Sequence, residues 1–380
     1  MRFSVDAHAI GCHLTGNEVY IRNLLHEFAR LDKSNEFIAY IAKPDALQYL
    51  PANIGTRWVS NNPYKRLGFD LARAVRADMP DVLHVQYTGP LFTKVPLVVS
   101  VHDVSYLEYP QYFTPQRARQ LRITVKRTVE SAGAVLTVSE YSRRAILRHY
   151  RIDPEKVVVV PNAVSSEFRP IERQTAQAAL QAKFGLSGPF ILMVGDLQPR
   201  KNHLGLLHAF EELTRAYPQL LHHLVFVGKD TWYTKEVRRA IERSSVKDRV
   251  HLTGFVNDAD LIHFYGACDL FVFPSFYEGF GLPILEAMAC GRAVVCSNTT
   301  AMPEVANAAG ILFDPGSVRE MTRAMADVLL DHDLRQRLER LGGNRAALFS
   351  WEQAALKTLD VYLSVAGAKM GVGRAVRAGV

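Results

Sequence analysis

The chain has 380 residues, of which 48% are hydrophobic and 22% are charged, so a disordered chain, a collagen-like repeat and a small disulfide scaffold are excluded. Its 45 basic and 38 acidic residues give a formal net charge of +7, which favours anionic partners such as phosphates, acidic membrane surfaces or nucleic acid. The four cysteines have no CxxC spacing, and no apolar run has the length of a membrane-spanning helix, so we expect a reduced, soluble, cytoplasmic protein without structural zinc.

Short apolar runs alternate with helical periodicity along the whole chain. The first half has six candidate strands, at residues 3–7, 36–42, 81–86, 96–102, 134–138 and 157–160. The second half has another six, at residues 190–194, 224–228, 250–252, 270–274, 293–296 and 311–313. Continuous Val, Ile and Leu strands joined by helices are typical of parallel sheets covered on both faces, which predicts an α/β fold.

Twelve strands are too many for one compact doubly wound sheet, so we expect two domains. Turn residues follow the strand at 157–160, and a weakly patterned stretch then extends to about Leu186. These features place the domain junction near residues 162–169. Small residues dominate after about Ala366, and we expect a loose tail at residues 369–380.

Two candidate ligand positions lie at strand ends in the first half. Gly16 lies in a loop between the first strand and a helix, where a residue without a side chain permits close backbone approach to a ligand. His102 and Asp103 end the strand at 96–102, at the edge where open α/β sheets bind ligands. A single histidine at a strand end is more often structural or solvated, so it assigns no site alone.

Residues 112–150 form a strongly basic segment with two acids and eight cations. The cations are Arg117, Arg119, Arg122, Lys126, Arg127, Arg143, Arg144 and Arg148. Leu121, Val125 and Val129 recur at four-residue spacing on a helix predicted from Pro115, and the basic residues fall mostly off that stripe. Two interpretations stay open: a solvated surface over a core stripe, or a surface that meets anionic lipid or a lipid-diphosphate acceptor.

A loop at residues 195–202 follows the strand at 190–194 and precedes a helix. Its adjacent cations, Arg200 and Lys201, suit a diphosphate, because arginine can make forked contacts and lysine supplies a point charge. Taken alone, such a pair is more often part of a solvated surface.

The most informative segment is residues 273–291. A buried strand ends at Pro274, a glycine-bearing loop follows, and a helix begins at about Leu282 with Pro283 in its first turn. The helix start predicts an anion site at the carboxyl edge of a parallel sheet. The anion would be held by the helix dipole and by the backbone N–H groups of Phe280, Gly281 and Leu282.

Two glutamates, Glu278 and Glu286, flank this anion site. Because a carboxylate repels a phosphate, sugar hydroxyls are the natural ligands of both. Their spacing and the surrounding P-S-x-x-E-G-F-G-L-P-x-L-E-A-M-A-x-G pattern resemble the E-x7-E signature of retaining glycosyltransferases of family 4, also called group 1 glycosyltransferases. Together with H-D-V-S at residues 102–105, the segment is most similar to bacterial mannosyl- and rhamnosyltransferases of surface-polysaccharide synthesis.

The resemblance covers residues 6 to about 362 and implies the GT-B fold, in which two Rossmann-like, doubly wound parallel-sheet domains face a cleft. The acceptor-side domain would comprise residues 1–165 and be completed by a C-terminal helix at about residues 352–368. The nucleotide-sugar domain would comprise residues 166–351.

The resemblance also implies roles for the charged residues of the second domain. Residues 195–202 are similar to the family's G-x-x-x-x-(R/E)-K-N loop, so Lys201 and Arg200 would bind the donor phosphates. Asp196 stands where many relatives have an arginine, which leaves more of this task to Arg200. Glu286 would bind the ribose, and Glu278 would bind a hydroxyl of the transferred sugar.

Further residues around the donor are implied in the same way. Phe255 and Val256 lie in a loop that is similar to the family's nucleobase-binding loop, and Gly16 lies in one similar to its loop over the donor phosphates. His102 would contact the transferred sugar. In this family the leaving diphosphate is thought to help deprotonate the acceptor, so no enzyme nucleophile is expected. No metal or other cofactor is expected either, because the cations and the helix dipole would take the place of a metal.

The implied reaction is the transfer of a sugar with retention, with GDP-mannose as the first candidate donor, to a saccharide or lipid-linked acceptor. Two alternatives remain: a nucleotide-sugar epimerase or hydrolase of the same fold, and a catalytically silent GT-B protein that binds sugar or scaffolds an assembly. No recognition motif for nucleic acid accompanies the charge. The DxD-like run Asp258-Ala259-Asp260 is interpreted as a helix start rather than a metal site.

Overall fold

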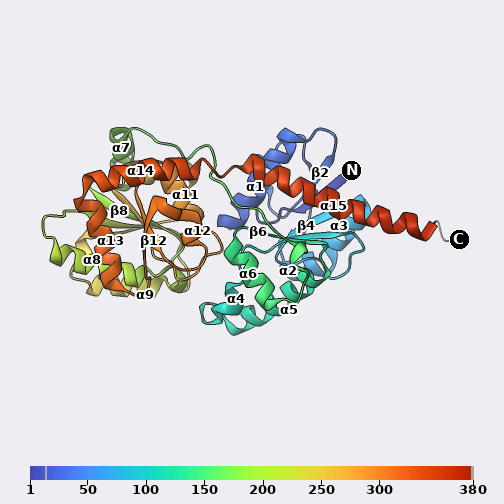
Figure 1. Ribbon diagram of the computed structural model, residues 1–380, viewed down its shortest axis with the longest axis horizontal. Helices are drawn as coiled ribbons and strands as arrows, with labels where there is room; N and C mark the ends of the chain where they lie inside the picture. The colour runs from blue at the N-terminus through green and yellow to red at the C-terminus, as the bar shows by residue number, and fades with distance from the viewer. Residues whose placement is uncertain (13–14, 378–380) are drawn as a thin grey trace. The chain divides into compact units, whose positions relative to one another are not determined.

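The computed structural model describes residues 1–12 and 15–377, and the chain divides into two compact units (Figure 1). Unit 1 comprises Met1–Asn162 and Ser350–Val380, and unit 2 comprises Ala163–Phe349. The sequence placed the corresponding boundaries at residues 165/166 and 351/352. Each unit is built around its own parallel sheet.

The sheet of unit 1 has seven strands in the order β3-β2-β1-β4-β5-β6-β7, and all its pairs are parallel. Its strands are β1 (Arg2–Asp6), β2 (Glu36–Ile41), β3 (Gly55–Trp58), β4 (Val82–Gln86), β5 (Leu97–Ser100), β6 (Ala134–Thr137) and β7 (Val157–Val159). The order reverses between β1 and β4. Open α/β sheets bind ligands beyond the carboxyl ends of the strands at such a reversal, so a site in unit 1 is expected there.

β3 is the strand that the sequence did not reveal. All four of its residues are exposed and it lies at the edge of the sheet, so it lacks the apolar run that marks a buried strand. The other six strands of unit 1 overlap the ranges predicted for them.

The C-terminal helix α15 (Trp351–Arg377) packs on α1 (Thr15–Leu31) and contacts β4, β5 and β6. Its Tyr362 is fully buried, and the Tyr362 hydroxyl lies 2.6 Å from Nδ1 of His84 in β4. The remaining helices of unit 1 are α2 (Pro63–Lys65), the π-helix Arg66–Asp70, α3 (Leu71–Asp78), α4 (Ser105–Glu108), α5 (Pro115–Ser131) and α6 (Glu140–His149).

α15 continues to Arg377, whereas the sequence predicted a loose tail from residue 369. Lysine, methionine, alanine and arginine in this stretch favour a helix and outweigh the two glycines on which the expectation rested. Within the described part of the chain, we find no helix with the length and apolar character needed to cross a membrane.

Unit 2 has a six-stranded parallel sheet in the order β10-β9-β8-β11-β12-β13, and its strands all overlap the predicted ranges. They are β8 (Phe190–Val194), β9 (His223–Val227), β10 (Val250–Gly254), β11 (Leu270–Phe273), β12 (Val294–Ser297) and β13 (Gly310–Phe313). The order reverses between β8 and β11, which makes the ends of these two strands the expected ligand position of unit 2.

The helices of unit 2 pack in pairs around this sheet, with α13 on α8, α10 on α7 and α11 on α14. They are α7 (Arg173–Phe184), α8 (His203–Ala216), α9 (Thr234–Arg243), α10 (Asp258–Ala267), α11 (Leu282–Ala289), α12 (Met302–Ala306), α13 (Val318–Leu330) and α14 (His332–Ala346). Leu206, Phe210 and Leu213 on one face of α8 are buried in the core together with residues of β8, β9 and β11.

Polar residues cap the helices α6 and α10. Ser139 accepts a hydrogen bond from the N–H of Ser142 at 3.0 Å at the start of α6. Asn257 caps α10 in the same way, with 2.9 Å to the N–H of Asp260. Asp258 and Asp260 occupy the first turn of α10, so the interpretation of this DxD-like run as a helix start is confirmed.

Candidate functional site

The loops after β8 and β11 leave the sheet of unit 2 where its strand order reverses, and hydrogen bonds join the two loops. The N–H of Phe276 donates to the carbonyl of Arg200 at 2.8 Å, and Nδ2 of Asn202 donates to the carbonyl of Pro274 at 3.2 Å. Asn202 also begins α8 from a left-handed conformation with φ of 61°, and its Oδ1 accepts from the N–H of Gly205. The R-K-N sequence is therefore held on a fixed platform.

A buried carboxylate pairs with both cations of this loop. Oε1 of Glu278 lies 2.7 Å from Nη1 of Arg200 and 2.6 Å from Nζ of Lys201. Lys201 and Glu278 are 8% and 9% exposed. A Cβ on Gly195 would lie 3.2 Å from Cδ of Lys201, so the glycine makes room for the lysine stem. The structure thus brings three predicted site residues together.

The charges of this cluster are fixed near neutral pH. Burial raises the pKa of Glu278, but Arg200 and Lys201 oppose it more strongly and lower the pKa to about 2. Burial lowers the pKa of Lys201, and the attraction of Glu278 works against that effect. Two cations and one carboxylate leave a net positive charge, which suits an anionic ligand.

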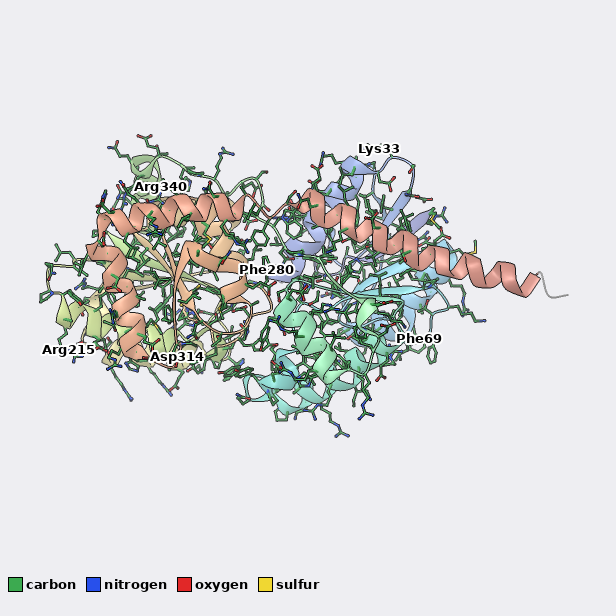
Figure 2. All side chains as sticks on the ribbon, viewed as in Figure 1. Lys33, Phe69, Arg215, Phe280, Asp314 and Arg340 are labelled. Carbon is green, nitrogen blue, oxygen red and sulfur yellow. The ribbon has the colours of Figure 1, made fainter. Side chains whose placement is uncertain are left out.

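The start of α11 has the geometry that the sequence predicted for an anion site. Gly281 precedes the helix with φ of 104°, a conformation that favours glycine. Among the described residues, none accepts a hydrogen bond from the N–H groups of Phe280, Gly281 or Leu282. Phe280, which Figure 2 labels, is buried and its ring packs edge-on against Phe349 with centroids 5.7 Å apart.

Glu286 lies inside α11 and is buried against a tyrosine. Its Oε2 accepts a hydrogen bond of 2.8 Å from the hydroxyl of Tyr265 in α10. Burial raises the pKa of Glu286 to about 7, although the Tyr265 hydrogen bond acts in the opposite direction. A carboxyl group with this pKa changes its charge near neutral pH, and its second oxygen can accept a ligand hydroxyl.

The predicted nucleobase loop follows β10 at the edge of the sheet. Phe255 is 51% exposed, and Nζ of Lys229 lies 5.5 Å from the centroid of its ring, whereas Val256 is buried. Gly254 turns the chain with φ of 75°, so the loop leaves the strand sharply.

Two residues near the unit 2 cluster were missed by the sequence analysis. Tyr265 of α10 was not singled out, although a buried tyrosine hydroxyl needs a hydrogen-bond partner, which here is Glu286. Thr300 lies outside the motif, but its Oγ1 accepts a hydrogen bond of 3.1 Å from the N–H of Glu278. Its φ of 55° is rare for a β-branched residue. The run of polar residues between β12 and α12 was the only signal for it.

In unit 1, His102 is held by residues from several elements. Its Nε2 lies 3.0 Å from Oε1 of Gln86, and its carbonyl accepts a hydrogen bond of 2.9 Å from the hydroxyl of Ser142. Tyr20 packs on its ring with centroids 4.7 Å apart. Burial lowers the pKa of His102 to about 4, against a smaller opposing effect of Asp103, so the ring is neutral at pH 7.

Gly16 is exposed in the first turn of α1, and no atom lies within 4 Å of a Cβ built on it. Leu14 of the same predicted loop lies outside the described residues. The carbonyl of the next residue, Asn17, accepts from Nε2 of Gln86 at 3.3 Å. Gly16 therefore lies in a helix rather than in the predicted loop, and Gln86, which the sequence analysis did not single out, links the start of this helix to His102.

A charged group also lies at the carboxyl end of β1. Asp6 is buried, with Oδ1 at 2.9 Å from Nδ1 of His8 and Oδ2 at 3.7 Å from Nε of Arg66. Burial raises the pKa of Asp6, but His8 and Arg66 bring it below its ordinary value. Arg66 is 6% exposed and makes no hydrogen bond with any residue that the structure describes. A guanidinium group that is buried without hydrogen bonds can still serve a polar ligand.

Comparisons with known proteins assign the family. The chain matches the family Glycosyl transferases group 1 over residues 178–345 and Glycosyltransferase Family 4 over residues 14–168. It is 35% identical over 266 residues to the O-antigen chain mannosyltransferase B of Escherichia coli, covering 70% of this chain and 69% of that one. This chain belongs to the group 1 glycosyltransferases.

Two further proteins are similar to this glycosyltransferase. It is 32% identical over 260 residues to the serotype-specific mannosyltransferase WbdA of Escherichia coli; the match covers 67% of this chain but only 32% of WbdA. A crystal structure of Anabaena Alr3699/HepE in complex with UDP and glucose superimposes with a TM-score of 0.76 at 19% identity, covering 96% of this chain and 99% of that one. That likeness shows the fold, which is the predicted GT-B class.

The glycosyltransferase shows no cluster of three or more His, Cys, Asp and Glu side chains suited to a metal ion in the part of the chain that the structure describes. The loops after β8 and β11 bear two cations, one paired glutamate and the start of α11.

Proposed function

We propose that this glycosyltransferase transfers mannose, with retention, from a nucleotide-diphosphate sugar to a saccharide or lipid-linked acceptor, and that GDP-mannose is the donor. The observation that carries the proposal is the buried group of Arg200, Lys201 and Glu278 at the strand-order reversal of unit 2. The names of the Escherichia coli relatives support mannose and O-antigen synthesis.

The donor diphosphate would bind to Arg200, Lys201 and the N–H groups that open α11. A phosphate group accepts hydrogen bonds from a guanidinium, an ammonium and free backbone N–H groups, and the helix dipole adds to the attraction. Because these groups supply the positive charge, we propose that neither a metal ion nor another cofactor is required. Activity should survive EDTA; a strict need for manganese that is lost in Asp260→Ala would contradict this.

The two glutamates would bind different parts of the donor. Glu286, with Oε2 engaged by Tyr265, would accept the ribose hydroxyls. Glu278 would accept a hydroxyl of the transferred mannose, and the two cations beside it would keep it ionised. The nucleobase would lie against the loop of Phe255 and Val256, with Gly16 of unit 1 over the donor phosphates.

His102 would contact the transferred sugar, and the leaving diphosphate would take the acceptor proton. Catalysis in this scheme consists of positioning the two substrates and stabilising the charge that develops on the leaving group. No covalent intermediate on the protein is invoked.

The acceptor would bind to unit 1. The buried Arg66 can donate to one sugar hydroxyl, and the carboxylate of Asp6 beside it can accept from another, which suits a neutral sugar. If so, Arg66→Met raises the KM for acceptor and leaves the affinity for GDP-mannose unchanged. An unchanged KM for acceptor would remove Arg66 from the site.

The basic segment of unit 1 supports peripheral contact with the inner face of an anionic membrane. A groove of about 570 Å³ on α5 is lined by Arg122, Ile123, Lys126, Arg127, Glu130 and Ser131. Ile123 is 60% exposed, and Arg127 holds the loop that bears the exposed Leu91 and Phe92. Arg127 and Arg143 donate to backbone carbonyls and Arg148 pairs with Glu108, whereas Lys126 makes only an exposed ion pair of 3.5 Å with Glu130, so Arg119, Arg122 and Lys126 are the better lipid ligands.

Vesicle sedimentation tests this contact. We expect salt-sensitive binding to vesicles with anionic lipid, no binding to neutral ones, and reduced binding when Arg119, Arg122 and Lys126 are changed to Ser. Donor affinity should not change in that variant. A wild-type protein that ignores anionic vesicles at low salt would mean a solvated surface.

A thermal-shift screen against nucleotide sugars, followed by a turnover assay, tests the function. The true donor stabilises the folded protein by mass action, so GDP-mannose should raise the melting temperature more than UDP-glucose does. An epimerase would convert the donor without acceptor, a hydrolase would release free sugar, and a silent binding protein would show the shift without any turnover. Absence of a shift with every nucleotide sugar would contradict the proposal.

A further inference from the structure

Gln86 is a buried side chain at the carboxyl end of β4, where the strand order of unit 1 reverses. Both ends of its amide are engaged. Oε1 lies 3.0 Å from Nε2 of His102, and Nε2 donates to the carbonyl of Asn17 at 3.3 Å. The residue thus joins the end of β4, the start of α1 and the histidine that follows β5.

The polarity of these two hydrogen bonds fixes the proton on His102. A backbone carbonyl can only accept, so the amide NH2 of Gln86 must face Asn17, and its Oε1 must face His102. Oε1 can also only accept, so Nε2 of His102 must carry a proton. The opposite orientation of the amide would place two oxygens against each other at Asn17.

The ring of His102 is held in this orientation by its neighbours. Tyr20 packs on it edge-on at 4.7 Å, and Tyr87 does so at 5.8 Å between ring centroids. Tyr87 follows Gln86 directly and has φ of 58°, a left-handed conformation that is costly for a bulky residue. Such a conformation persists only where the surrounding structure holds it. Here it places Gln86 and Tyr87 around the imidazole of His102.

Nδ1, the other ring nitrogen of His102, does not take part in the contacts that hold the ring. Among the described residues, Nδ1 of His102 has no hydrogen-bond partner. Because burial lowers the pKa of His102 to about 4, Nδ1 carries a lone pair rather than a proton at neutral pH. A lone pair on a fixed ring accepts a hydrogen bond from a ligand hydroxyl.

We propose that Gln86 is a positioning residue: it holds His102 as the Nε2–H tautomer and so presents the Nδ1 lone pair to a hydroxyl group of the transferred sugar. The second half of this inference rests on the proposed function, whereas the first half concerns the free protein. Two measurements therefore separate the two halves.

The tautomer is read by NMR on the full chain with 15N-labelled histidine. Correlations between the ring nitrogens and carbon-bound ring protons distinguish a protonated Nε2 from a protonated Nδ1, and the spectrum of His102→Asn assigns the signal among the 13 histidines. We expect one Nε2–H state with a slowly exchanging proton, and faster exchange of that proton in Gln86→Met. A protonated Nδ1 in the wild-type protein would overturn the proposal, whether or not the chain transfers mannose.

The pH profile of transfer tests the role of the Nδ1 lone pair. In Gln86→Glu, a carboxylate next to Nε2–H stabilises the imidazolium, so the pKa of His102 should rise by about one to three pH units. The other titratable groups around the ring are His84, Tyr20, Tyr87 and Asp103. Protonation then occupies Nδ1. We expect kcat of Gln86→Glu at saturating GDP-mannose to fall between pH 7.5 and 5.5, by about fourfold for a rise of about two in the pKa of His102, and to recover at high pH.

The controls keep this result specific. The wild-type protein and Gln48→Glu, the same change at an exposed site of unit 1, should keep a flat profile over this range. Gln86→Met should lose activity equally at all these pH values while its melting temperature with GDP-mannose still rises. If Gln86→Glu follows the wild-type pH profile, the Nδ1 lone pair has no role, because a proton there would then do no harm.

Discussion

The candidate sites of the two units are built in opposite ways. In unit 2, Arg200, Lys201 and Glu278 form a buried group of full charges, and two of them are neighbours in the chain. In unit 1, His102 is neutral and is held by uncharged partners from α1, β4 and α6. Under the proposed function, unit 2 would supply affinity for an anionic donor, and unit 1 would supply precise placement without charge.

The largest expected effect is that of Lys201→Ala. The change removes a charge-assisted hydrogen bond to the donor phosphates, which costs about 1.5–3 kcal/mol, and affinity should fall roughly ten- to a hundredfold. Calorimetric titration with GDP measures it. Lys183→Ala, which removes an exposed lysine of the same unit, should bind GDP normally. Wild-type affinity in Lys201→Ala would refute the phosphate assignment.

Unit 1 should instead be sensitive to the loss of a neutral buried hydrogen bond. Tyr362→Phe leaves Nδ1 of His84 without its partner and should destabilise the protein by about 1–3 kcal/mol, seen as a lower urea midpoint. GDP affinity should not change. Tyr64→Phe, at a tyrosine that is 76% exposed, serves as the control and should leave the midpoint unchanged. Equal midpoints for the two variants would mean that the His84 contact adds nothing to stability.

The two glutamates of unit 2 should separate affinity from transfer. Glu286→Gln should weaken GDP binding by about tenfold, because its proposed ligand is the ribose. Glu278→Gln leaves Arg200 and Lys201 without their carboxylate, so GDP should bind at least as tightly while mannose transfer falls. Calorimetry with GDP and a transfer assay on both variants provide the comparison. Identical losses of GDP affinity would count against the division.

A smaller effect concerns pH. The pKa of Glu286 is raised to about 7, so the carboxylate proposed to bind ribose is fully present only above this value, and affinity for GDP-mannose should fall by a few-fold from pH 8 to 6.5. GDP-mannose is the better probe because free GDP titrates in this range itself. Tyr265→Phe removes the hydrogen bond that favours the carboxylate and should move the transition to higher pH. A flat profile in wild-type protein would exclude Glu286 as an ionised ligand.

The sequence was most informative where a site is built from contiguous residues. The motifs at residues 195–202 and 273–291 contain Arg200, Lys201 and Glu278, and the reversal of strand order brings these two loops together. The sequence of each motif could not show that Glu278 pairs with both cations, because this pairing depends on the hydrogen bonds between the two loops.

The unit 1 site was only partly readable for a related reason. Gln86 acts through Asn17 and His102, and Tyr362 acts through His84, so each partner lies far away in the chain and only the folded sheet joins them. β3 was not predicted for a different reason, because an exposed edge strand has no periodic pattern of apolar residues.

The most direct test of the account is the stereochemistry of mannose transfer from GDP-mannose, followed by proton NMR with a synthetic mannobiose as acceptor. The account predicts that an α-mannosyl product forms as GDP-mannose is consumed, in the presence of EDTA, and that Lys201→Ala abolishes most of it. A β-linked product would contradict retention, and a GDP-mannose signal that stays constant with wild-type protein would contradict mannose transfer from this donor.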